Sequence, residues 1–258
     1  MPKRDEAEVA NATTEPHLHV VADYAALSHL AADIVTRVVN ETPGGAITLP
    51  TGETPRGMYE ELARRIERSD LDFSSIHFFC MDEYLGKGID DKASLTAWLD
   101  DVFLTPANLH GPNIHFVPSE DKNPAQAAAA YDARIAELGG LKLAVLGLGR
   151  NGHIAFNEPG SAIDSRTRVV DLTDESRDQN AAYYEEGEII PDQAITIGVG
   201  TILDSDLIVL IVSGANKSAI LKAVLEGPIS EEVPGSFLQT VGDRLIVIAD
   251  TAAAAELS

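Results

Sequence analysis

The chain contains a single cysteine, Cys80, and no long apolar segment. One cysteine excludes an internal disulfide and a zinc site built from several thiolates. No stretch approaches the roughly 20 apolar residues of a membrane-spanning helix, and the polar first residues lack the apolar core of a signal peptide. We therefore expect a cytoplasmic protein with no membrane partner and no bound metal.

Basic residues are scarce: 19 Lys and Arg stand against 41 Asp and Glu, which gives a formal net charge of −22. Such an acidic surface repels phosphate backbones, so the protein is not expected to bind nucleic acid through a broad basic face. The acid excess fits either adaptation to high salt or an ordinary acidic protein. Basic residues at a functional site should therefore be few and specific in their role.

Short β-branched runs alternate with longer segments of helical apolar spacing. The apolar runs at 143–148 and 207–212 are nearly continuous, which is typical of parallel strands covered by helices on both faces. The sequence predicts one three-layer α/β domain over 19–258, after a flexible N-terminal arm over 1–18. The expected strands are Ala46–Pro50, Ile76–Cys80, Ile114–Val117, Leu143–Leu148, Ala194–Val199, Leu207–Val212 and Leu245–Ala249. The expected helices are Tyr24–Val39, Pro55–Arg68, Pro124–Leu138 and Asn216–Glu226.

Ligands of such sheets bind beyond the carboxyl ends of the strands, so four strand-end loops carry the functional argument. In the first loop, Pro55 opens a helix, and the turn before it contains Thr51, Gly52 and Thr54. Hydroxyls and free amides at a helix N-terminus suit an anion or a sugar. The alternative is a plain helix cap by Thr54. The Gly-Lys-Ser/Thr ending of an ATP-binding P-loop is absent.

The second loop begins with two carboxylates. Asp82 and Glu83 directly follow an apolar strand, where burying a charge is costly without a purpose. Either residue can act as a general base whose pKa is tuned by partial desolvation. A solvated acidic loop explains the pair equally well in a chain of this charge.

The third loop, residues 143–161, has the glycine spacing GxGxxG of a dinucleotide-binding turn. A Pro-Gly pair soon interrupts any helix after it, and the motif lies in mid-chain, so both features argue against a nucleotide. The turn instead lets the backbone at Gly149 pass close to a ligand and presents His153. Glu158 can then orient the imidazole, as in other carboxylate–histidine pairs.

The fourth loop, residues 212–221, ends a strand in glycine and begins a helix with Lys217 in its first turn. A lysine is unfavourable beside the positive end of a helix unless it meets an anion there. Lys217 is therefore predicted to bind an anionic ligand, and a surface lysine is the alternative.

Together these stretches resemble the glucosamine-6-phosphate deaminase family, from about residue 20 to 250. The matching motifs are LPTGETP at 49–55, MDEYLG at 81–86, GLGRNGHIAFNEP at 147–159 and SRTR at 165–168. The third motif is long and highly specific. The related 6-phosphogluconolactonases typically carry Asp-Glu-Arg in the second motif and a different sequence after Gly-His. The resemblance implies a three-layer Rossmann-like sandwich with a mostly parallel sheet.

The resemblance also implies catalytic roles. Asp82 would move a proton between C2 and C1 of an opened amino sugar, and His153 would assist ring opening. Glu158 and Asn151 would set the orientation and charge of His153, and position 151 is Asp in some relatives. This chemistry needs no metal or organic cofactor. The family includes monomers and larger assemblies, which leaves a homo-oligomer open.

For binding, the resemblance implies that Thr51, Gly52, Glu53 and Thr54 form a sugar-phosphate loop. Lys217 would add a cation to the phosphate pocket. The implied partner is a small-molecule amino sugar phosphate, converted from glucosamine 6-phosphate to fructose 6-phosphate and ammonia.

Two departures from the family pattern bear on this substrate. Glu53 stands where relatives have a small residue, and Ala182 stands where they have an arginine that helps to bind phosphate. Both changes should weaken phosphate binding unless Arg56 or Arg150 compensates. The alternatives are therefore galactosamine 6-phosphate or an unphosphorylated amino sugar, then a lactonase, then a non-catalytic sensor. A sensor has no need of the proton-transfer residues.

Overall fold

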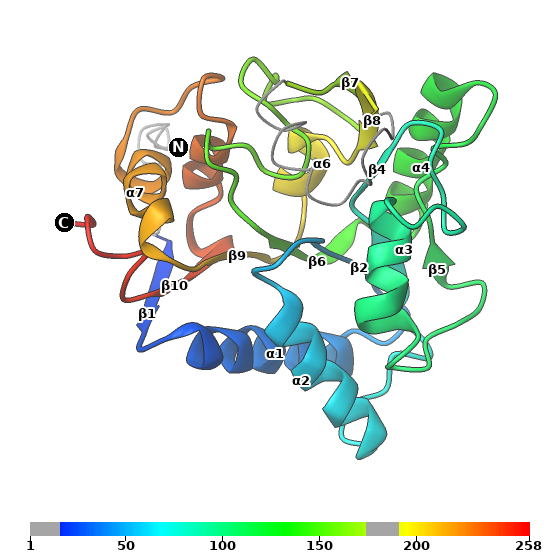
Figure 1. The fold of residues 1–258 in the computed structure, drawn as a ribbon, viewed down its shortest axis with the longest axis horizontal. Helices are drawn as coiled ribbons and strands as arrows, with labels where there is room; N and C mark the ends of the chain where they lie inside the picture. The colour runs from blue at the N-terminus through cyan, green and yellow to red at the C-terminus, as the bar shows by residue number, and fades with distance from the viewer. Residues whose placement is uncertain (1–15, 174–190) are drawn as a thin grey trace, which may run out of the picture.

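A computed structural model describes residues 16–173 and 191–258. Seven parallel strands form a central sheet, and three more form a small antiparallel sheet beside it (Figure 1). In spatial order the central strands are β1 (His17–Val21), β10 (Leu245–Asp250), β9 (Ile208–Val212), β6 (Leu141–Leu146), β2 (Ala46–Leu49), β3 (His77–Cys80) and β5 (Ile114–His115). The small sheet has the order β4 (Asp82–Tyr84), β8 (Gln193–Thr196) and β7 (Arg168–Asp171). The predicted three-layer α/β sandwich with a mostly parallel sheet is confirmed.

Helices cover both faces of the central sheet (Figure 1). One face carries α1 (Tyr24–Glu41) and α2 (Arg56–Glu67), and the other carries α6 (Val199–Leu203) and α7 (Ser218–Glu226). At the β5 end lie α3 (Leu95–Leu99), which continues as a π-helical turn over Asp100–Leu104, and α4 (Pro124–Glu137). Two 3₁₀ segments, Ala215–Lys217 and Pro234–Arg244, complete the elements of the described residues.

The apolar pattern of the sequence explains this layering. All five residues of β9, Ile-Val-Leu-Ile-Val, are buried, because helices cover the strand on both sides. Helix α1 buries Leu27, Ala31 and Val38, which recur on one side of the helix and face the core. The helix begins where the Asp23 side chain accepts a hydrogen bond from Ala26 N at 2.9 Å.

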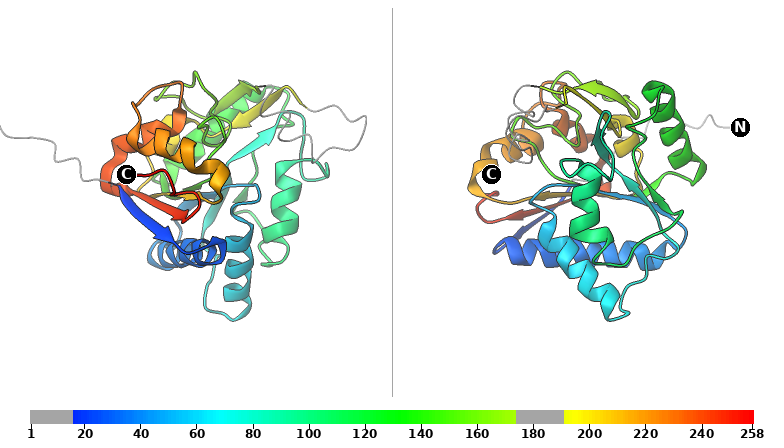
Figure 2. Two further views of the ribbon diagram at one scale, coloured as in Figure 1. Left: turned by 60° about the vertical axis from the view of Figure 1, so that its left-hand side comes forward. Right: turned by 45° about the vertical axis from the view of Figure 1, so that its right-hand side comes forward.

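Several sequence-based boundaries are wrong, and two of them change the assignment of an element. The arm expected over 1–18 extends too far, because β1 begins at His17 and pairs with β10 at the edge of the sheet (Figure 2). Four of the five β1 residues are exposed, so no alternation of buried and exposed residues marks the strand. The strand expected over 194–199 lies in the small sheet as β8, and Val199 already begins α6.

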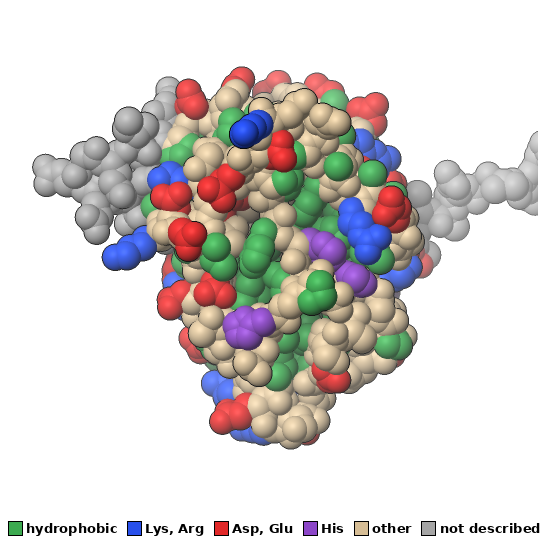
Figure 3. Space-filling model, turned by 90° about the vertical axis from the view of Figure 1, so that its right-hand side faces the viewer, with side chains coloured by type: hydrophobic (Ala, Val, Ile, Leu, Met, Phe, Trp, Pro, Cys, Tyr) green, Lys and Arg blue, Asp and Glu red, His purple; other side chains and the backbone are tan. Residues whose placement is uncertain are grey.

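The surface reflects the charge imbalance of the sequence. Acidic side chains are spread widely over the face shown in Figure 3, and basic side chains occur there in a few places. Within the described residues, no helix is both long enough and apolar enough to span a bilayer.

Candidate active site

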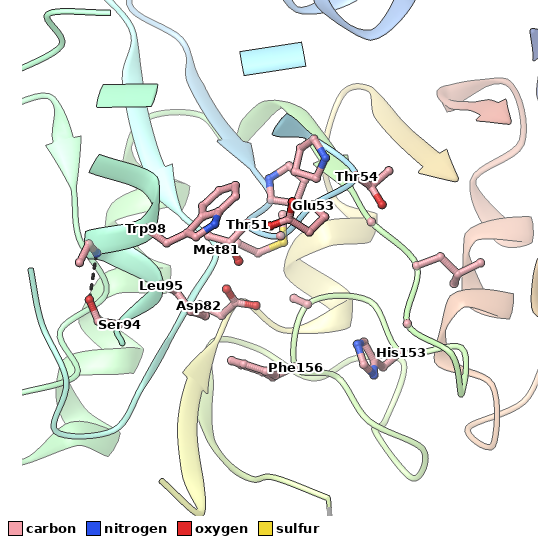
Figure 4. Close-up of a pocket in the computed structure, with 18 of the residues that line it drawn as sticks. Thr51, Glu53, Thr54, Met81, Asp82, Ser94, Leu95, Trp98, His153 and Phe156 are labelled. Atoms are coloured by element: carbon pink, nitrogen blue, oxygen red, sulfur yellow. Dashed lines mark hydrogen bonds between the residues drawn. The ribbon is translucent and has the colours of Figure 1, made fainter. Parts of the chain in front are cut away.

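The four loops identified in the sequence meet around one cavity of about 570 Å³ at the carboxyl ends of β2, β3, β6 and β9. The sequence-predicted residues that line it are Thr51, Gly52, Glu53, Thr54, Asp82, Gly149, His153 and Lys217. Asp82 and His153 face the same open space, which Phe156 borders on one side (Figure 4). The cavity therefore combines a carboxylate, an imidazole and a cation.

Asp82 is the carboxylate that faces the cavity. It begins β4, pairs with Thr196 of β8, and is only 7% exposed. Its Oδ1 atom has no hydrogen-bond partner among the described residues. Burial, and secondarily the charge of Glu83, raise the pKa of Asp82 to about 7. A carboxyl group with this pKa can both take and give a proton near neutral pH.

Glu83 is directed to a different place. Its side chain is fully buried and accepts hydrogen bonds from the backbone N–H groups of Tyr84, Leu95 and Thr96, at 2.8, 3.1 and 2.7 Å. These donors lie on β4 and at the start of α3. Neither carboxylate is a solvated surface charge, and only Asp82 lines the cavity.

The GxGxxG turn holds His153 in place. Gly149 N donates to the carbonyl of His153 at 2.9 Å, and a Cβ atom on Gly149 would overlap the His153 ring. The glycine is therefore required by the imidazole that lies against it. The turn opens no long helix, and its role here is to bring a side chain to the cavity.

Glu158 and Asn151 contact His153 and are not among the residues that line the cavity. Glu158 Oε1 is 3.4 Å from His153 Nδ1, and Asn151 Nδ2 donates to Glu158 Oε2 at 2.7 Å. The Asn151 side-chain oxygen also accepts from His153 N at 3.2 Å. Asn151 thus connects the backbone of His153 to the carboxylate that faces its ring, without adding a negative charge.

Two polar residues to which the sequence assigned no role, one buried and one partly buried, support this turn. Asn157 is fully buried and donates to the carbonyls of Ile154 and Ile197 at 3.0 and 2.9 Å. Arg168, the last residue of the SRTR motif, donates to Asn157 Oδ1 at 2.9 Å. The signal for Asn157 was its place in a long specific motif, and its partners could be seen only in three dimensions.

The first loop lies at the N-terminal end of α2. Pro55 is the N-cap residue and makes no side-chain cap, so the reading of Thr54 as a plain helix cap is wrong. Gly52 has a φ of 104°, a conformation that side chains disfavour. Glu53 is ion-paired with Arg56, which lowers the pKa of Glu53 because its hydrogen bonds favour the carboxylate.

Lys217 closes a 3₁₀ turn directly before α7, so the helix begins two residues later than expected from Asn216. Lys217 lines the cavity, and its Nζ atom donates to the carbonyl of Leu148 at 2.7 Å. Asp250 also stabilises this loop, because its carboxylate accepts hydrogen bonds from Gly214 N and from the Ser213 hydroxyl. The ammonium group is thus fixed beside the glycine turn that carries His153.

One wall of the cavity had no signal in the sequence. It comes from residues 92–101 and includes Ser94, Leu95 and Trp98. The Arg56 guanidinium lies 5.3 Å from the centre of the Trp98 ring. This wall follows from the position of α3, which is distant in sequence from the four loops.

Three other expectations from the sequence concern a bound metal, Ala182 and Arg150. Within 16–173 and 191–258, no group of three or more His, Cys, Asp or Glu side chains is arranged to hold a metal ion. Ala182 lies outside the described residues. Arg150, named as a compensating cation, is exposed and does not line the cavity.

Comparisons with known proteins agree with this geometry. Residues 22–247 match the family model described as glucosamine-6-phosphate isomerases/6-phosphogluconolactonase. A glucosamine-6-phosphate deaminase of Cutibacterium acnes is 38% identical over 244 residues, which cover 93% of this chain and 91% of that protein. A solved structure of a monomeric glucosamine-6-phosphate deaminase superposes with a TM-score of 0.88 at 34% identity, and covers 93% of this chain and 99% of the other. A 6-phosphogluconolactonase of Trypanosoma brucei, at 19% identity and a TM-score of 0.75, covers 95% of this chain and all of its own, and shares the fold.

Proposed function

The chain belongs to the family of glucosamine-6-phosphate isomerases and 6-phosphogluconolactonases, and we propose that it converts glucosamine 6-phosphate to fructose 6-phosphate and ammonia. The observation that carries this proposal is a buried carboxyl group with a pKa of about 7, Asp82, which shares a cavity with His153. An aldose–ketose shift needs one base that serves two adjacent carbons at neutral pH. The relatives named for this reaction support the same conclusion.

Binding of the phosphate is assigned to the first and fourth loops. The backbone amides and hydroxyls of Thr51 and Thr54 lie before α2, where an anion is stabilised. Lys217 adds a positive charge on the cavity wall. These groups would place the sugar between Asp82 and His153.

Ring opening is assigned to His153. Its imidazole would take the proton of the O1 hydroxyl and deliver a proton to O5, which breaks the C1–O5 bond and leaves the open aldehyde. Glu158 beside Nδ1 stabilises the protonated ring in this exchange. Asn151 forms hydrogen bonds with both Glu158 and the backbone of His153, and these bonds keep the carboxylate next to the ring.

Isomerisation and deamination are assigned to Asp82. Its carboxylate would take the proton from C2 and return it to C1, while a proton of the substrate's amino group passes through His153 to O1. The product is a ketose imine at C2. Water adds to this carbon, and the C2–N bond breaks to release ammonia and the keto group of fructose 6-phosphate.

A substrate panel tests the proposal. Ammonia release and ketose formation are measured for glucosamine 6-phosphate, galactosamine 6-phosphate and free glucosamine, and acid production for 6-phosphogluconolactone. We expect the fastest release from glucosamine 6-phosphate. Preference for another amino sugar would change the substrate and keep the chemistry, whereas hydrolysis of the lactone alone, or binding without turnover, would refute it.

We also propose where the protein is located and consider whether it forms an oligomer. A cytoplasmic location is supported by the substrate, because a charged sugar phosphate does not cross a lipid bilayer unaided. A homo-oligomer stays a prediction, since the solved relative is described as monomeric. Light scattering of the purified protein would decide between one copy and several.

A further inference from the structure

Glu83 is a fully buried carboxylate that the proposed reaction does not use. It is the neighbour of Asp82 on β4, and adjacent residues of a strand point to opposite faces. Asp82 therefore faces the cavity while Glu83 points to the start of α3. A buried charge needs compensating partners, and Glu83 has three of them.

One partner is Tyr84 N on β4 itself, and the other two are the first N–H groups of α3. Glu83 accepts from Leu95 N and Thr96 N, and the Ser94 hydroxyl accepts from Ala97 N at 2.9 Å. Two side chains thus satisfy three of the donors that a helix leaves open at its N-terminus. Since α3 has only five residues before its π-helical turn, this connection contributes much of what fixes its position.

The helix fixed in this way forms the cavity wall opposite the glycine turn. Leu95 and Trp98 lie on that wall, and Figure 4 shows both side chains on the same side of the cavity as Asp82. Loss of the connection would let β4 rotate and α3 move apart from it. Both changes would alter where the Asp82 carboxylate points.

We propose that Glu83 is a positioning residue for the reaction: it fastens α3 to β4, aims Asp82 into the cavity, and keeps a negative charge beside that base. The proposal rests on the function proposed above, in which Asp82 is the base. Glu83 itself touches no substrate, because it lies outside the cavity lining.

The surroundings of Asp82 leave Glu83 as the anion that acts on it most directly. Tyr59 of α2, Cys80 of β3 and Tyr131 of α4 also face Asp82, and burial raises the pKa of each, so all three stay neutral at working pH. His153, Lys217 and Glu53 lie on other walls of the cavity, and Lys92 and Asp101 belong to the wall formed by residues 92–101. Burial raises the pKa of Glu83 too, but its N–H donors from Thr96, Leu95 and Tyr84 oppose this and favour the carboxylate.

The test is Glu83→Gln, which keeps the size of the side chain and removes its charge. We expect kcat to fall roughly tenfold with little change in KM, because Asp82 is aimed less well. We also expect the acidic limb of kcat/KM to move down by about half a pH unit or more, because the repulsion that raises the pKa of Asp82 is lost.

Asp132→Asn is the matched control. Asp132 also uses three hydrogen bonds, from Thr167 N, Thr167 Oγ1 and Thr201 Oγ1, to connect separate elements, and it does not line the cavity. Its loss should lower stability and leave the pH profile in place. If Glu83→Gln matches Asp132→Asn in both kcat and the acidic limb, the proposal is overturned.

A variant that keeps the charge covers the case in which Glu83→Gln does not fold. In Glu83→Asp the carboxylate is too short to reach α3, so kcat should fall roughly tenfold while the acidic limb stays near that of the wild type. An unchanged kcat in this variant would overturn the proposal.

An NMR titration of the Asp82 carboxyl carbon, assigned with Asp82→Asn, separates this proposal from the proposed function because it needs no substrate. A lower titration midpoint in Glu83→Gln supports the action of Glu83 on Asp82 even if no amino sugar is deaminated. An equal midpoint in the two proteins overturns it even if deamination is observed.

Discussion

The carboxylate of Glu53 and the guanidinium of Arg56 form a bidentate ion pair, with Nε–Oε2 and Nη2–Oε1 distances of 3.1 and 3.0 Å. Glu53 stands at the edge of the predicted phosphate loop, where an unpaired negative charge would oppose a sugar phosphate. Its partner three residues later offsets that charge. The negative charge at position 53, which was expected to weaken phosphate binding, is therefore accompanied by a local compensation.

This pair gives a prediction about phosphate affinity. Arg56→Gln should raise KM for glucosamine 6-phosphate, because Glu53 then faces the phosphate uncompensated, and Glu53→Gly should lower it. The side chains are 39% and 65% exposed, so solvent screening limits each effect to about two- to fivefold. Free glucosamine has no phosphate and serves as the control. Equal changes for both sugars would show that the pair does not act through the phosphate.

Two of the glycines in the third loop, Gly147 and Gly149, allow a direct test of His153. Gly149→Ala would push the imidazole from its place, whereas a Cβ atom on Gly147 meets nothing within 4 Å. We expect Gly149→Ala to reduce kcat on the closed-ring substrate by roughly 10- to 100-fold, and Gly147→Ala to lose far less. Steady-state rates of the two variants decide the matter. Similar losses in both would show that the position of His153 is not limiting.

Burial of Asp82 should cost stability at high pH. Its folded pKa of about 7 lies above the value of an exposed aspartate, so between these values the folded state binds more protons, and stability falls as the pH rises. Asp82→Asn removes the charge and should stabilise the protein at pH 8 by roughly 2–4 kcal/mol, with a smaller gain at pH 5. Urea unfolding at both pH values measures this. A gain that is absent at pH 8 would contradict the assigned burial of charge.

The net charge of −22 predicts a response to salt. Acidic side chains repel one another over the surface (Figure 3), and counter-ions relieve that repulsion. The melting temperature should therefore rise as sodium chloride goes from low to molar concentration. A flat or falling Tm over this range would argue against adaptation to high salt.

The sequence predicted the central sheet and the four loops because long apolar strands and strand-end turns are local signals. The residue pattern alone could not choose between Asp82 and Glu83, and Asp82 was named only through the family resemblance. The two are neighbours, and in the structure the contact of Glu83 with α3 separates their roles. The pairing of Glu53 with Arg56 was accessible from their spacing of three residues at a helix start.

Features that depend on distant contacts were missed. The strands of the small sheet have only three or four residues, too few to show an apolar period. The Trp98 wall depends on where α3 packs. Strand β1 is an exposed edge whose partner, β10, lies at the other end of the chain.

The central claim is that Asp82 is the base of a deaminating isomerase. The most direct measurement is the rate of ammonia release from glucosamine 6-phosphate by wild-type protein and by Asp82→Asn, from pH 5 to 9. We predict that kcat/KM of the wild type rises through about pH 7 as Asp82 loses its proton. We predict that Asp82→Asn binds the substrate but turns it over at least roughly 100-fold more slowly at every pH. Comparable turnover by Asp82→Asn, or no ammonia from the wild type, would contradict the account.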